Sequence, residues 1–365
     1  MKRKIVHLTS VHGRHDIRIF LKECSSLVKA GYDVSFVVSD GLGNEEKNGV
    51  KIYDVGKQNG RINRILNTTK NVFKKCVELN ADLYHFHDPE LIPTGLKLKK
   101  LKKKVIFDSH EDFASDILTK DYIPSVLRFF ISSAFKIYDT VSCKKFDVIV
   151  TATKAISEIY KNRGCKTIVI NNYPILDELN TSANVEKEKI CCFAGAQNQI
   201  RGIKELVIAA GQIDGKLYLA GPKTGAFEDD LKSLDGWKNV VDLGNLPRQK
   251  LANLLGKSSV GLVTYLPAPN HVDAQPNKLF EYMSVGLPVI ASNFPLWKEI
   301  VVDNNCGLCV DPTNPKEIAD AINYFFNKNT ESLQMGLNGK KAVETIYNWN
   351  PEEVKLISLY KELLK

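Results

Sequence analysis

The chain has 365 residues, of which 44% are hydrophobic and 25% charged, and its formal net charge is +8. This length predicts about two domains with a core each, and the composition excludes the disordered and fibrous classes. No run approaches the roughly 18 apolar residues of a transmembrane helix. The basic N-terminus turns polar too early for a signal peptide, so we expect a cytoplasmic protein whose eight cysteines are reduced.

The positive charge is concentrated in the first half. Residues 1–180 carry 30 Lys and Arg against 21 Asp and Glu, a net of +9, which leaves −1 for the rest. The densest run is KLKKLKKK at 97–104. Such a run is usually a solvated helix end, and contact with anionic lipid headgroups is the sharper alternative. Nucleic acid is a weaker candidate, because no recognised nucleic-acid-binding module accompanies the charge.

The N-terminal segment predicts a strand at 4–8, a polar loop at 9–16, a helix at 17–30 and a strand at 33–38. It opens like a mononucleotide-binding fold, but G-x-G-x-x-G is missing, which argues against a nicotinamide dehydrogenase. The loop and the start of the helix hold His12, Arg14 and Arg18. These residues could line a cleft for an acidic ligand, or belong to an ordinary exposed loop.

Residues 81–90 predict a strand that runs into a loop. His85 and His87 alternate with Tyr84 and Phe86, so both histidines should point to one face of the strand. Paired histidines can bind a metal, but no third ligand is evident, and we expect packed or cleft-edge histidines. The next strand, 104–108, runs into Ser-His-Glu-Asp at 109–112.

Residues 122–138 are aromatic and apolar, with Arg128 and Lys136 as the only charges. We expect a buried helix of the first domain. The alternative is a helix that docks on a membrane or a lipid acceptor. Strands are predicted at 147–152 and 167–171, followed by a polar linker up to residue 189.

The second half begins with a strand at 189–194, a glycine-flanked turn at 195–202 and a helix from 203 to about 212. Such a turn presents backbone N–H groups and a helix N-terminus to an anion. Arg201 and Lys204 add positive charge there, and arginine can bind a diphosphate through two hydrogen bonds. Further strands that end in turns are predicted at 216–220 and 240–244.

Residues 260–291 predict a strand, a polar loop, a helix that begins near Pro276 and a second strand. Ligands bind at the carboxyl ends of strands in open α/β sheets. Asp273 and Glu281 bracket the start of this helix. The two carboxylates could accept hydrogen bonds from a ribose or another polyol, or they could be solvated surface groups.

The run PNKLFEYMSVGLPVIAS at 276–292 resembles the nucleotide-sugar site of retaining glycosyltransferase family 4. These are GT-B enzymes among the group 1 glycosyltransferases, and the variant here is similar to the branch that builds surface polysaccharides. The family carries an acid, seven residues and then Glu. Asp273 and Glu281 have that spacing, with Asp where the family usually has Glu, and residues 274–278 replace the family's glycine-rich segment.

The resemblance implies an α/β fold of two Rossmann-like, doubly wound parallel-sheet domains that face each other across a cleft. The expected parts are an acceptor domain at 1–175, a nucleotide-sugar domain at 186–348 and a helix at 349–365 that crosses back to the first domain. It also implies site residues. The donor would be bound by Arg201, Lys204, Leu246, Asn277, Lys278 and Glu281; the catalytic set would be His87, Asp273 and Glu281; the acceptor side would be lined by His12, Arg14, Arg18, His110 and Glu111.

The implied reaction is hexosyl transfer with retention, from a UDP-sugar to a saccharide or polyprenyl-linked acceptor. No metal or other cofactor is expected, because cations and a helix N-terminus can stabilise the leaving diphosphate. The enzyme would act in the cytoplasm, with peripheral contact to an anionic membrane as an additional expectation. Two alternatives stay open: a GT-B-like UDP-sugar 2-epimerase, and a non-catalytic scaffold that binds nucleotide sugars.

Overall fold

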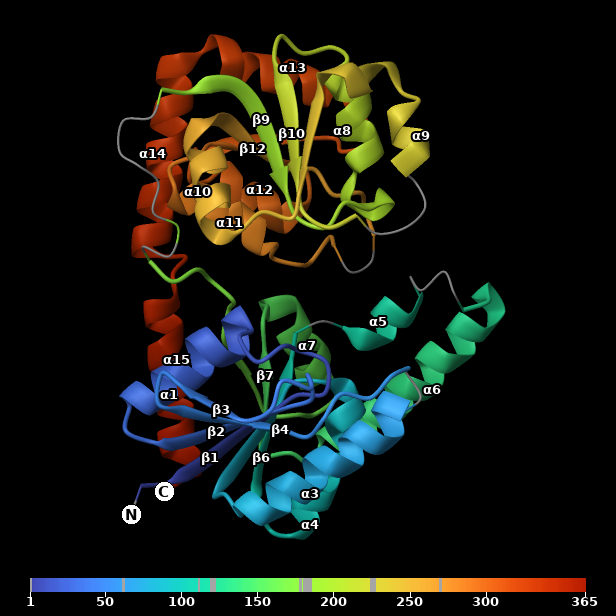
Figure 1. Ribbon diagram of the computed structural model, residues 1–365, viewed down its shortest axis with the longest axis vertical. Coiled ribbons are helices and arrows are strands. Elements are labelled where there is room, and N and C mark those ends of the chain that lie inside the picture. Colours follow the sequence, from blue (N-terminus) through green and yellow to red (C-terminus); the bar gives the residue numbers. More distant parts are fainter. Residues whose placement is uncertain are drawn as a thin grey trace. The chain divides into compact units, whose positions relative to one another are not determined.

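The computed structural model describes residues 2–60, 63–110, 112–118, 123–176, 179, 186–223, 228–268 and 271–365. They form two compact units (Figure 1). The first unit runs to Asn172 and includes Trp349–Lys365, and the second consists of Tyr173–Asn348. Each unit contains a sheet with helices packed around it.

The sheet of the first unit has the strand order β3-β4-β2-β1-β5-β6-β7-β8. In the described chain β3 pairs antiparallel with β4, and the other pairs are parallel. The strands are β1 (Lys4–Leu8), β2 (Asp33–Val38), β3 (Glu45–Lys47), β4 (Val50–Asp54), β5 (Leu83–Phe86), β6 (Lys104–Ser109), β7 (Val148–Thr151) and β8 (Thr167–Val169). The chain order reverses between β1 and β5, where His7 lies opposite His85.

The first helical segment of this unit is unusual. The predicted helix at 17–30 begins as a π-helix, η1 (Ile17–Cys24), and continues as α1 (Ser25–Lys29). The other helices are η2 (Arg64–Thr68), α3 (Thr69–Leu79), η3 (Pro89–Leu91), α4 (Ile92–Lys100), α5 (Phe113–Leu118), α6 (Ser125–Cys143), α7 (Lys154–Asn162) and α15 (Trp349–Leu363). Helix α15 is held in this unit by Trp349, whose Nε1 donates to Ser26 Oγ at 3.0 Å, and by Glu352, which accepts from the Asn171 backbone N–H at 2.9 Å.

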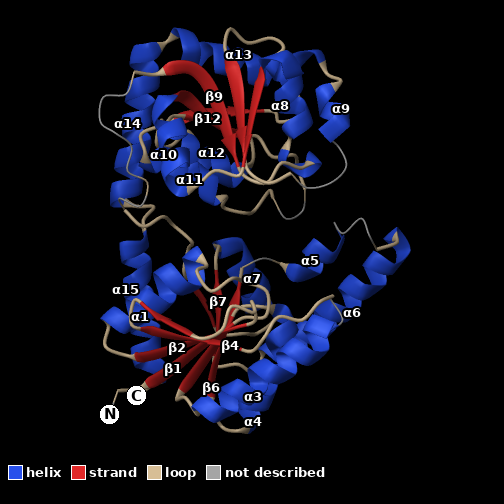
Figure 2. Ribbon diagram, in the orientation of Figure 1, coloured by secondary structure: helices blue, strands red, loops and turns tan. Residues whose placement is uncertain are grey.

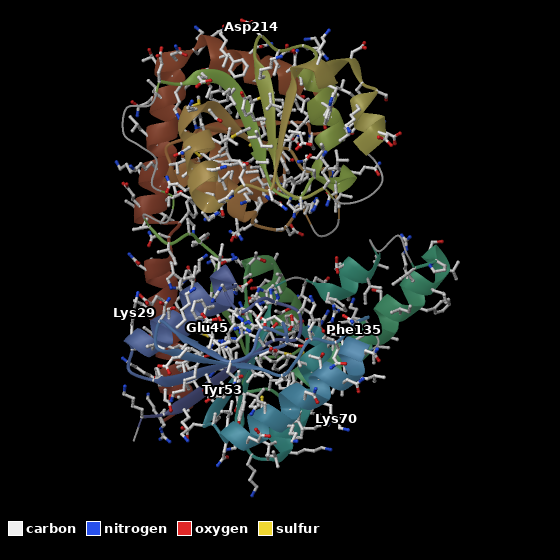
Figure 3. The ribbon with its side chains drawn as sticks, viewed as in Figure 1. Lys29, Glu45, Tyr53, Lys70, Phe135 and Asp214 are labelled. Carbon is white, nitrogen blue, oxygen red and sulfur yellow. The ribbon has the colours of Figure 1, made fainter. Side chains whose placement is uncertain are left out.

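Apolar side chains of the strands and covering helices form the core of this unit. Gly95 of α4 lies so close to the sheet that a Cβ there would meet the Phe86 ring at 2.7 Å and the Phe146 ring at 2.9 Å. Tyr53 and Phe135, labelled in Figure 3, pack against the margin of this core.

The expectation of a buried helix at 122–138 is wrong for α6; Tyr122 itself lies outside the described residues. Phe129 and Phe130 are 65% and 63% exposed, and the side chains that α6 buries are Ser132, Asp139, Ser142 and Cys143. Phe135 packs against the core, but most of the large apolar side chains of this helix face away from it.

The second unit has a six-stranded parallel sheet in the order β11-β10-β9-β12-β13-β14 (Figure 2). Its strands are β9 (Glu188–Ala194), β10 (Lys216–Ala220), β11 (Val240–Gly244), β12 (Ser258–Val263), β13 (Val289–Ser292) and β14 (Gly307–Val310). Its helices are η4 (Gln199–Arg201), α8 (Ile203–Ala210), α9 (Glu228–Lys232), η5 (Asp235–Asn239), α10 (Arg248–Lys257), α11 (Asn277–Ser284), α12 (Pro295–Val301), α13 (Pro315–Asn327) and α14 (Asn329–Thr345).

The predicted fold class, two parallel-sheet α/β domains, is confirmed. Numbered from its own first strand, the second sheet reads 3-2-1-4-5-6, the order of a Rossmann fold. Such sheets bind ligands at the carboxyl ends of the strands where the order reverses. These switch points lie between β1 and β5 in the first unit and between β9 and β12 in the second. Among the described residues, no helix is both long and apolar enough to cross a membrane.

Candidate functional site

At the switch point of the second unit, the loops after β9 and β12 meet. The backbone N–H of Leu266 donates to Ile200 O at 2.9 Å. The Arg201 guanidinium lies over the Tyr265 ring, 5.3 Å from its centroid. A Cβ on Gly195 would come within 2.9 Å of Arg201 Nη1. The Arg201 guanidinium therefore lies between the Tyr265 ring of the loop after β12 and the Gly195 backbone of its own loop. It remains partly exposed.

Gly202 explains why the backbone can take this path. Its φ is +72°, in the left-handed region, and a Cβ would stand 2.2 Å from Thr264 O. Glycine is therefore required both by the conformation and by the close approach of the two loops.

Glu281 lies one turn into α11 and is buried. Its carboxylate accepts from Lys278 Nζ at 2.7 Å and from Arg248 Nη1 at 3.3 Å. Burial raises the pKa of the Tyr265 hydroxyl, which the charge of Arg201 lowers and that of Glu281 raises further. Both charges thus act on one ring, and the predicted residues Arg201, Lys278 and Glu281 converge at this switch point.

The other residues predicted for the donor lie around this centre. Lys204, Asp273 and Asn277 are exposed. Leu246, after β11, packs against the core. Within the described part of the chain, none of these four side chains makes a contact that fixes a role.

At the switch point of the first unit, Asp88 joins the two loops. One carboxylate oxygen accepts from Thr9 Oγ1 and from the Ser10 backbone N–H, each at 2.6 Å. The other lies 3.4 Å from Nε2 of His12, whose side chain is 34% exposed. Charged and polar side chains of the protein itself thus occupy this edge of the sheet.

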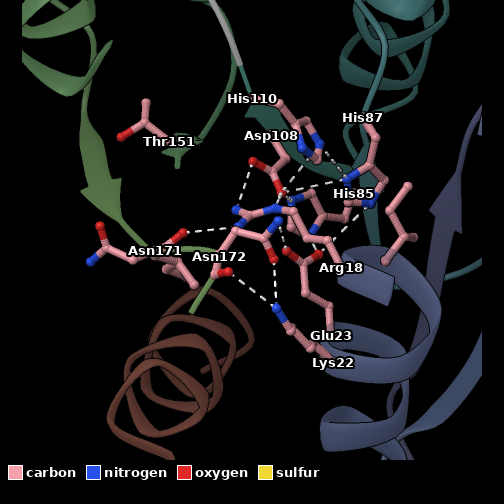
Figure 4. Close-up of polar contacts among 12 residues, drawn as sticks. Arg18, Lys22, Glu23, His85, His87, Asp108, His110, Thr151, Asn171 and Asn172 are labelled. Atoms are coloured by element: carbon pink, nitrogen blue, oxygen red, sulfur yellow. Dashed lines mark hydrogen bonds and ion pairs between the residues drawn. The ribbon is translucent and has the colours of Figure 1, made fainter. Parts of the chain in front are cut away.

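His87, which precedes Asp88 in the chain, belongs to a cluster of buried ionisable side chains (Figure 4). Arg18 donates from Nε and Nη2 to Asp108 at 3.0 and 3.1 Å, and from Nη1 to Ile170 O at 3.0 Å. Arg18 Nε is also 3.2 Å from Glu23 Oε1. One buried cation therefore faces two buried acids.

Histidines extend this cluster towards the surface. His87 Nε2 lies 3.0 Å from His7 Nδ1, and His87 Nδ1 lies 3.4 Å from His110 Nε2. Tyr360 Oη, from α15, lies 2.7 Å from His85 Nδ1 and 3.0 Å from His7 Nε2. The alternation in β5 does send His85 and His87 to one face, as predicted. The His87 side chain is 0% exposed, whereas that of His110 is 23% exposed.

Burial sets the protonation of this cluster. It lowers the pKa of His7 and His85 well below the ordinary value, with repulsion from neighbouring histidines adding to the effect. Burial and the nearby Asp108 charge raise the pKa of Glu23, against the opposing effect of Arg18. Burial alone would raise the pKa of Asp108, but the Arg18 charge holds it well below its ordinary value. We infer neutral imidazoles at His7 and His85 beside an Arg18–Asp108 ion pair.

The two arginines predicted to line a ligand cleft both form ion pairs with carboxylates of the protein itself. Arg14 donates from Nε and Nη2 to Asp40 at 2.8 and 2.6 Å, and from Nη1 to Glu45 at 3.2 Å. Arg18 is bound as described above, and both side chains are buried. Glu111 lies outside the described residues.

Two groups among the described residues have metal-ligating atoms close together. These are His7, Glu23, His85 and His87, and His87, Asp108 and His110; within each group the atoms lie within 4.8 Å of one another. Histidine and carboxylate are ligands that zinc accepts. The acids of these two groups, Glu23 and Asp108, already face a positive charge, which is the guanidinium of Arg18.

Sequence reasoning missed Glu23, Asp108, Tyr360, Tyr265 and Arg248. A carboxylate at Glu23 on the core-facing side of the first helix was an available signal, because a buried charge requires a partner. Tyr360 and Arg248 gave none, since their partners lie 275 and 33 residues away.

Two models of known protein families match the chain, one for each structural unit. The model described as glycosyl transferases group 1 matches residues 176–342, and that of glycosyltransferase family 4 matches 18–173, so together they span most of the chain.

Relatives of known sequence include an alpha-1,3/1,6-mannosyltransferase of Dictyostelium discoideum, 35% identical over 27% of this chain and 23% of that protein. A sucrose synthase of Nitrosomonas europaea is 25% identical over 45% of this chain and 22% of that protein. The chain thus spans less than a quarter of the length of these two. A Haemophilus influenzae glycosyltransferase without an assigned role is 25% identical over 87% of this chain and 88% of its own.

Similar solved structures include the sucrose-phosphate synthase of Thermosynechococcus elongatus, with a TM-score of 0.81 and 18% identity over 99% of both chains. The Anabaena protein HepE, in complex with UDP and glucose, has a TM-score of 0.75 and 15% identity over 99% of this chain and 100% of its own. At these identities the likeness establishes the shared fold.

Proposed function

Because the chain belongs to the group 1 glycosyltransferases of the GT-B fold, we propose that it transfers a hexosyl group from a UDP-sugar to a saccharide or polyprenyl-linked saccharide, with retention. The observation that carries this proposal is the convergence of Arg201, Lys278 and Glu281 at the β9/β12 switch point. Cations suit a diphosphate, and a carboxylate suits the hydroxyls of ribose. A nucleotide sugar carries both groups.

We assign the donor contacts as the family resemblance implies them. Arg201 and Lys278 bind the diphosphate, with Lys204 and the N-terminal turn of α11 at Asn277 adding attraction. Glu281 accepts from the ribose hydroxyls. Leu246 contacts the base and Asp273 the sugar. HepE, which shares this fold, was solved with UDP and glucose, and this supports uridine as the nucleoside.

The reaction breaks the bond between the anomeric carbon and the diphosphate oxygen, and the electron pair leaves with UDP. The acceptor oxygen forms the new bond on the same face of the sugar, and its proton passes to the diphosphate oxygen that leaves. Arg201 and Lys278 stabilise the charge on the leaving diphosphate. Preorganised electrostatic stabilisation of this kind is often the largest catalytic contribution, and the proposal needs no metal ion or other cofactor.

In the first unit, we assign the acceptor side to the loops around His12 and His110. His110 is the partly exposed member of the histidine cluster, and His87 lies directly behind it. We propose that His110 contacts a sugar hydroxyl, and that His87 acts as the catalytic histidine of the sequence expectation or positions His110 from the interior. Replacing His87 with Asn tests this, because loss of turnover with unchanged UDP binding supports either role, and an unchanged turnover contradicts both.

We also place the enzyme in the cytoplasm. All eight cysteines are free thiols, which agrees with a reducing compartment.

The test is calorimetric binding of UDP, GDP and ADP and of their sugars to the intact chain. We expect UDP to bind, Glu281→Gln to weaken both UDP and UDP-sugar, and Asp273→Asn to weaken the UDP-sugar alone. The bound donor is then tested for transfer to saccharide acceptors. Absence of nucleotide binding contradicts the proposal. Release of an epimerised UDP-sugar without acceptor identifies an epimerase, and binding without turnover identifies a scaffold.

A further inference from the structure

Helix α6 exposes most of its large apolar side chains, with Phe135 as the one that packs against the core. The side chains that it buries are small or polar, Ser132, Asp139, Ser142 and Cys143. The exposed large apolar side chains, between 40% and 68% accessible, are Val126, Leu127, Phe129, Phe130, Ile131, Ile137, Tyr138 and Val141. Positions 126, 130, 137 and 141 recur at helical spacing, so they form one stripe along the helix.

The orientation of α6 is fixed by satisfied polar contacts on its buried side. Ser132 Oγ donates to Ala114 O at 2.7 Å. Asp139 forms an ion pair with Arg163 and accepts from Cys143 Sγ at 2.9 Å. Rotating the helix to bury its phenylalanines would break these contacts and leave a carboxylate without its cation. The apolar stripe is therefore held outward by the fold.

The charges around this stripe are positive. Lys136 is exposed on α6, and Lys144 and Lys145 are exposed at its carboxyl end. Asp139, the acid within α6, is buried and paired. The neighbouring helix α4 ends in the lysine-rich run at 97–104 and contacts α6. An apolar face bordered by lysines matches a surface that is apolar inside and anionic outside.

We propose that α6 docks on an anionic phospholipid bilayer, with Phe129 and Phe130 at the boundary between headgroups and acyl chains. The lysines contact the lipid phosphates. A second copy of the chain would also cover the apolar stripe. It fits less well, because α6 offers no exposed acid to the lysines of its partner across the described residues 123–146. The proposal concerns attachment only, and it does not depend on the reaction proposed above.

The test is flotation of the intact protein with vesicles of phosphatidylcholine alone or mixed with phosphatidylglycerol. We expect flotation with the anionic vesicles, and a decrease in high salt because screening shortens the range of the attraction. The double variant Phe129→Ser, Phe130→Ser should lower the bound fraction at least tenfold. The matched control is Leu333→Ser, Leu337→Ser on α14, where the side chains are 55% and 60% exposed; it should float like the unaltered protein.

Charge and oligomeric state complete the test. Lys144→Glu, Lys145→Glu should weaken flotation with anionic vesicles, and UDP binding by every variant should match the unaltered protein, which keeps this result separate from the donor site. Absence of flotation overturns the proposal, as does unchanged flotation of the Phe129→Ser, Phe130→Ser variant. A dimer in light scattering that this variant converts to a monomer assigns the stripe to a second copy instead.

Discussion

The two switch points share a topology but use their charges differently. At β1/β5, Arg18 is buried between Asp108 and Glu23, and histidines surround them. At β9/β12, Arg201 remains partly exposed above an aromatic ring, and Lys278 shares one carboxylate with Arg248. Parallel strand order alone therefore does not create an anion site. The second switch point differs in Arg201, which contacts an aromatic ring where Arg18 contacts two buried acids.

The difference has an energetic side. Burying charges is costly, and the cost is recovered only with good geometry and a complete set of partners. Removing one partner from the first cluster should therefore damage folding, whereas removing a cation from the second should damage binding. The following predictions test this contrast.

The largest expected effect is on the stability of the first unit. Arg18→Met keeps much of the side-chain volume but leaves Asp108 and Glu23 without their cation. Loss of one partner of a buried pair costs about 3–5 kcal/mol. Urea denaturation measures the free energy of unfolding. Arg201→Met is the matched control and should unfold like the unaltered protein; equal destabilisation by the two changes would remove the contrast.

The next effect is on ligand affinity. Arg201→Met should weaken UDP binding, because a hydrogen bond to a charged group contributes about 1.5–3 kcal/mol. That is roughly a 10- to 150-fold rise in Kd by calorimetry. Lys204→Ala removes an exposed cation of the same segment and should have a smaller effect. Unchanged UDP affinity in Arg201→Met would place the diphosphate elsewhere.

Acid should act mainly on the first unit. The folded-state pKa values of His7, His85 and His110 are lowered, so below about pH 6.5 these histidines gain protons on unfolding, and stability falls as the pH falls. The raised pKa values of Glu23 and His12 have the opposite sign and offset part of this effect. Each net proton amounts to about 1.4 kcal/mol per pH unit.

Unfolding followed between pH 7.5 and 5.5 measures this slope. His85→Gln should reduce it by about one proton. In the second unit His271 has a lowered pKa, whereas the first unit has three such histidines, His7, His85 and His110. Acid should therefore destabilise the first unit more, and hydrogen exchange should show it opening at a higher pH. If the second unit opens first, the prediction that the buried histidines make the first unit more sensitive to acid is wrong.

The smallest effect is expected from a chelator. Arg18 faces the acids of the first cluster, and Arg201 and Lys278 are assigned to the diphosphate, so EDTA should leave both the melting temperature and UDP binding unchanged. A lower melting temperature in EDTA, restored by zinc, would show that the group of His7, Glu23, His85 and His87 holds a metal.

Local patterns predicted much of this molecule. The alternation at 83–87 correctly sends both histidines to one face, because residue spacing in a strand fixes direction. The glycine-flanked turn at 195–202 correctly indicated where a cation would lie beside the end of a strand. These features depend on neighbours along the chain.

Features that depend on distant partners were missed or reversed. Helical periodicity identified the apolar side of α6 but does not say whether that side meets the core. That depends on whether Ser132 and Asp139 find partners, and these are Ala114 and Arg163. In the same way, His87 in isolation gives no sign that its ring will be enclosed by His7 and His110.

The hydroxyl of Tyr360 also has a consequence for biosynthesis. It bonds to His7 and His85, and its partner His85 precedes it by 275 residues. During translation the first sheet therefore emerges long before α15 is available, while the second unit, from Tyr173 to Asn348, is synthesised without interruption. Contacts of such separation form late. The nascent first unit must hold His7 and His85 without this hydroxyl until the second unit has left the ribosome, which makes it the part of the chain most dependent on protection during synthesis.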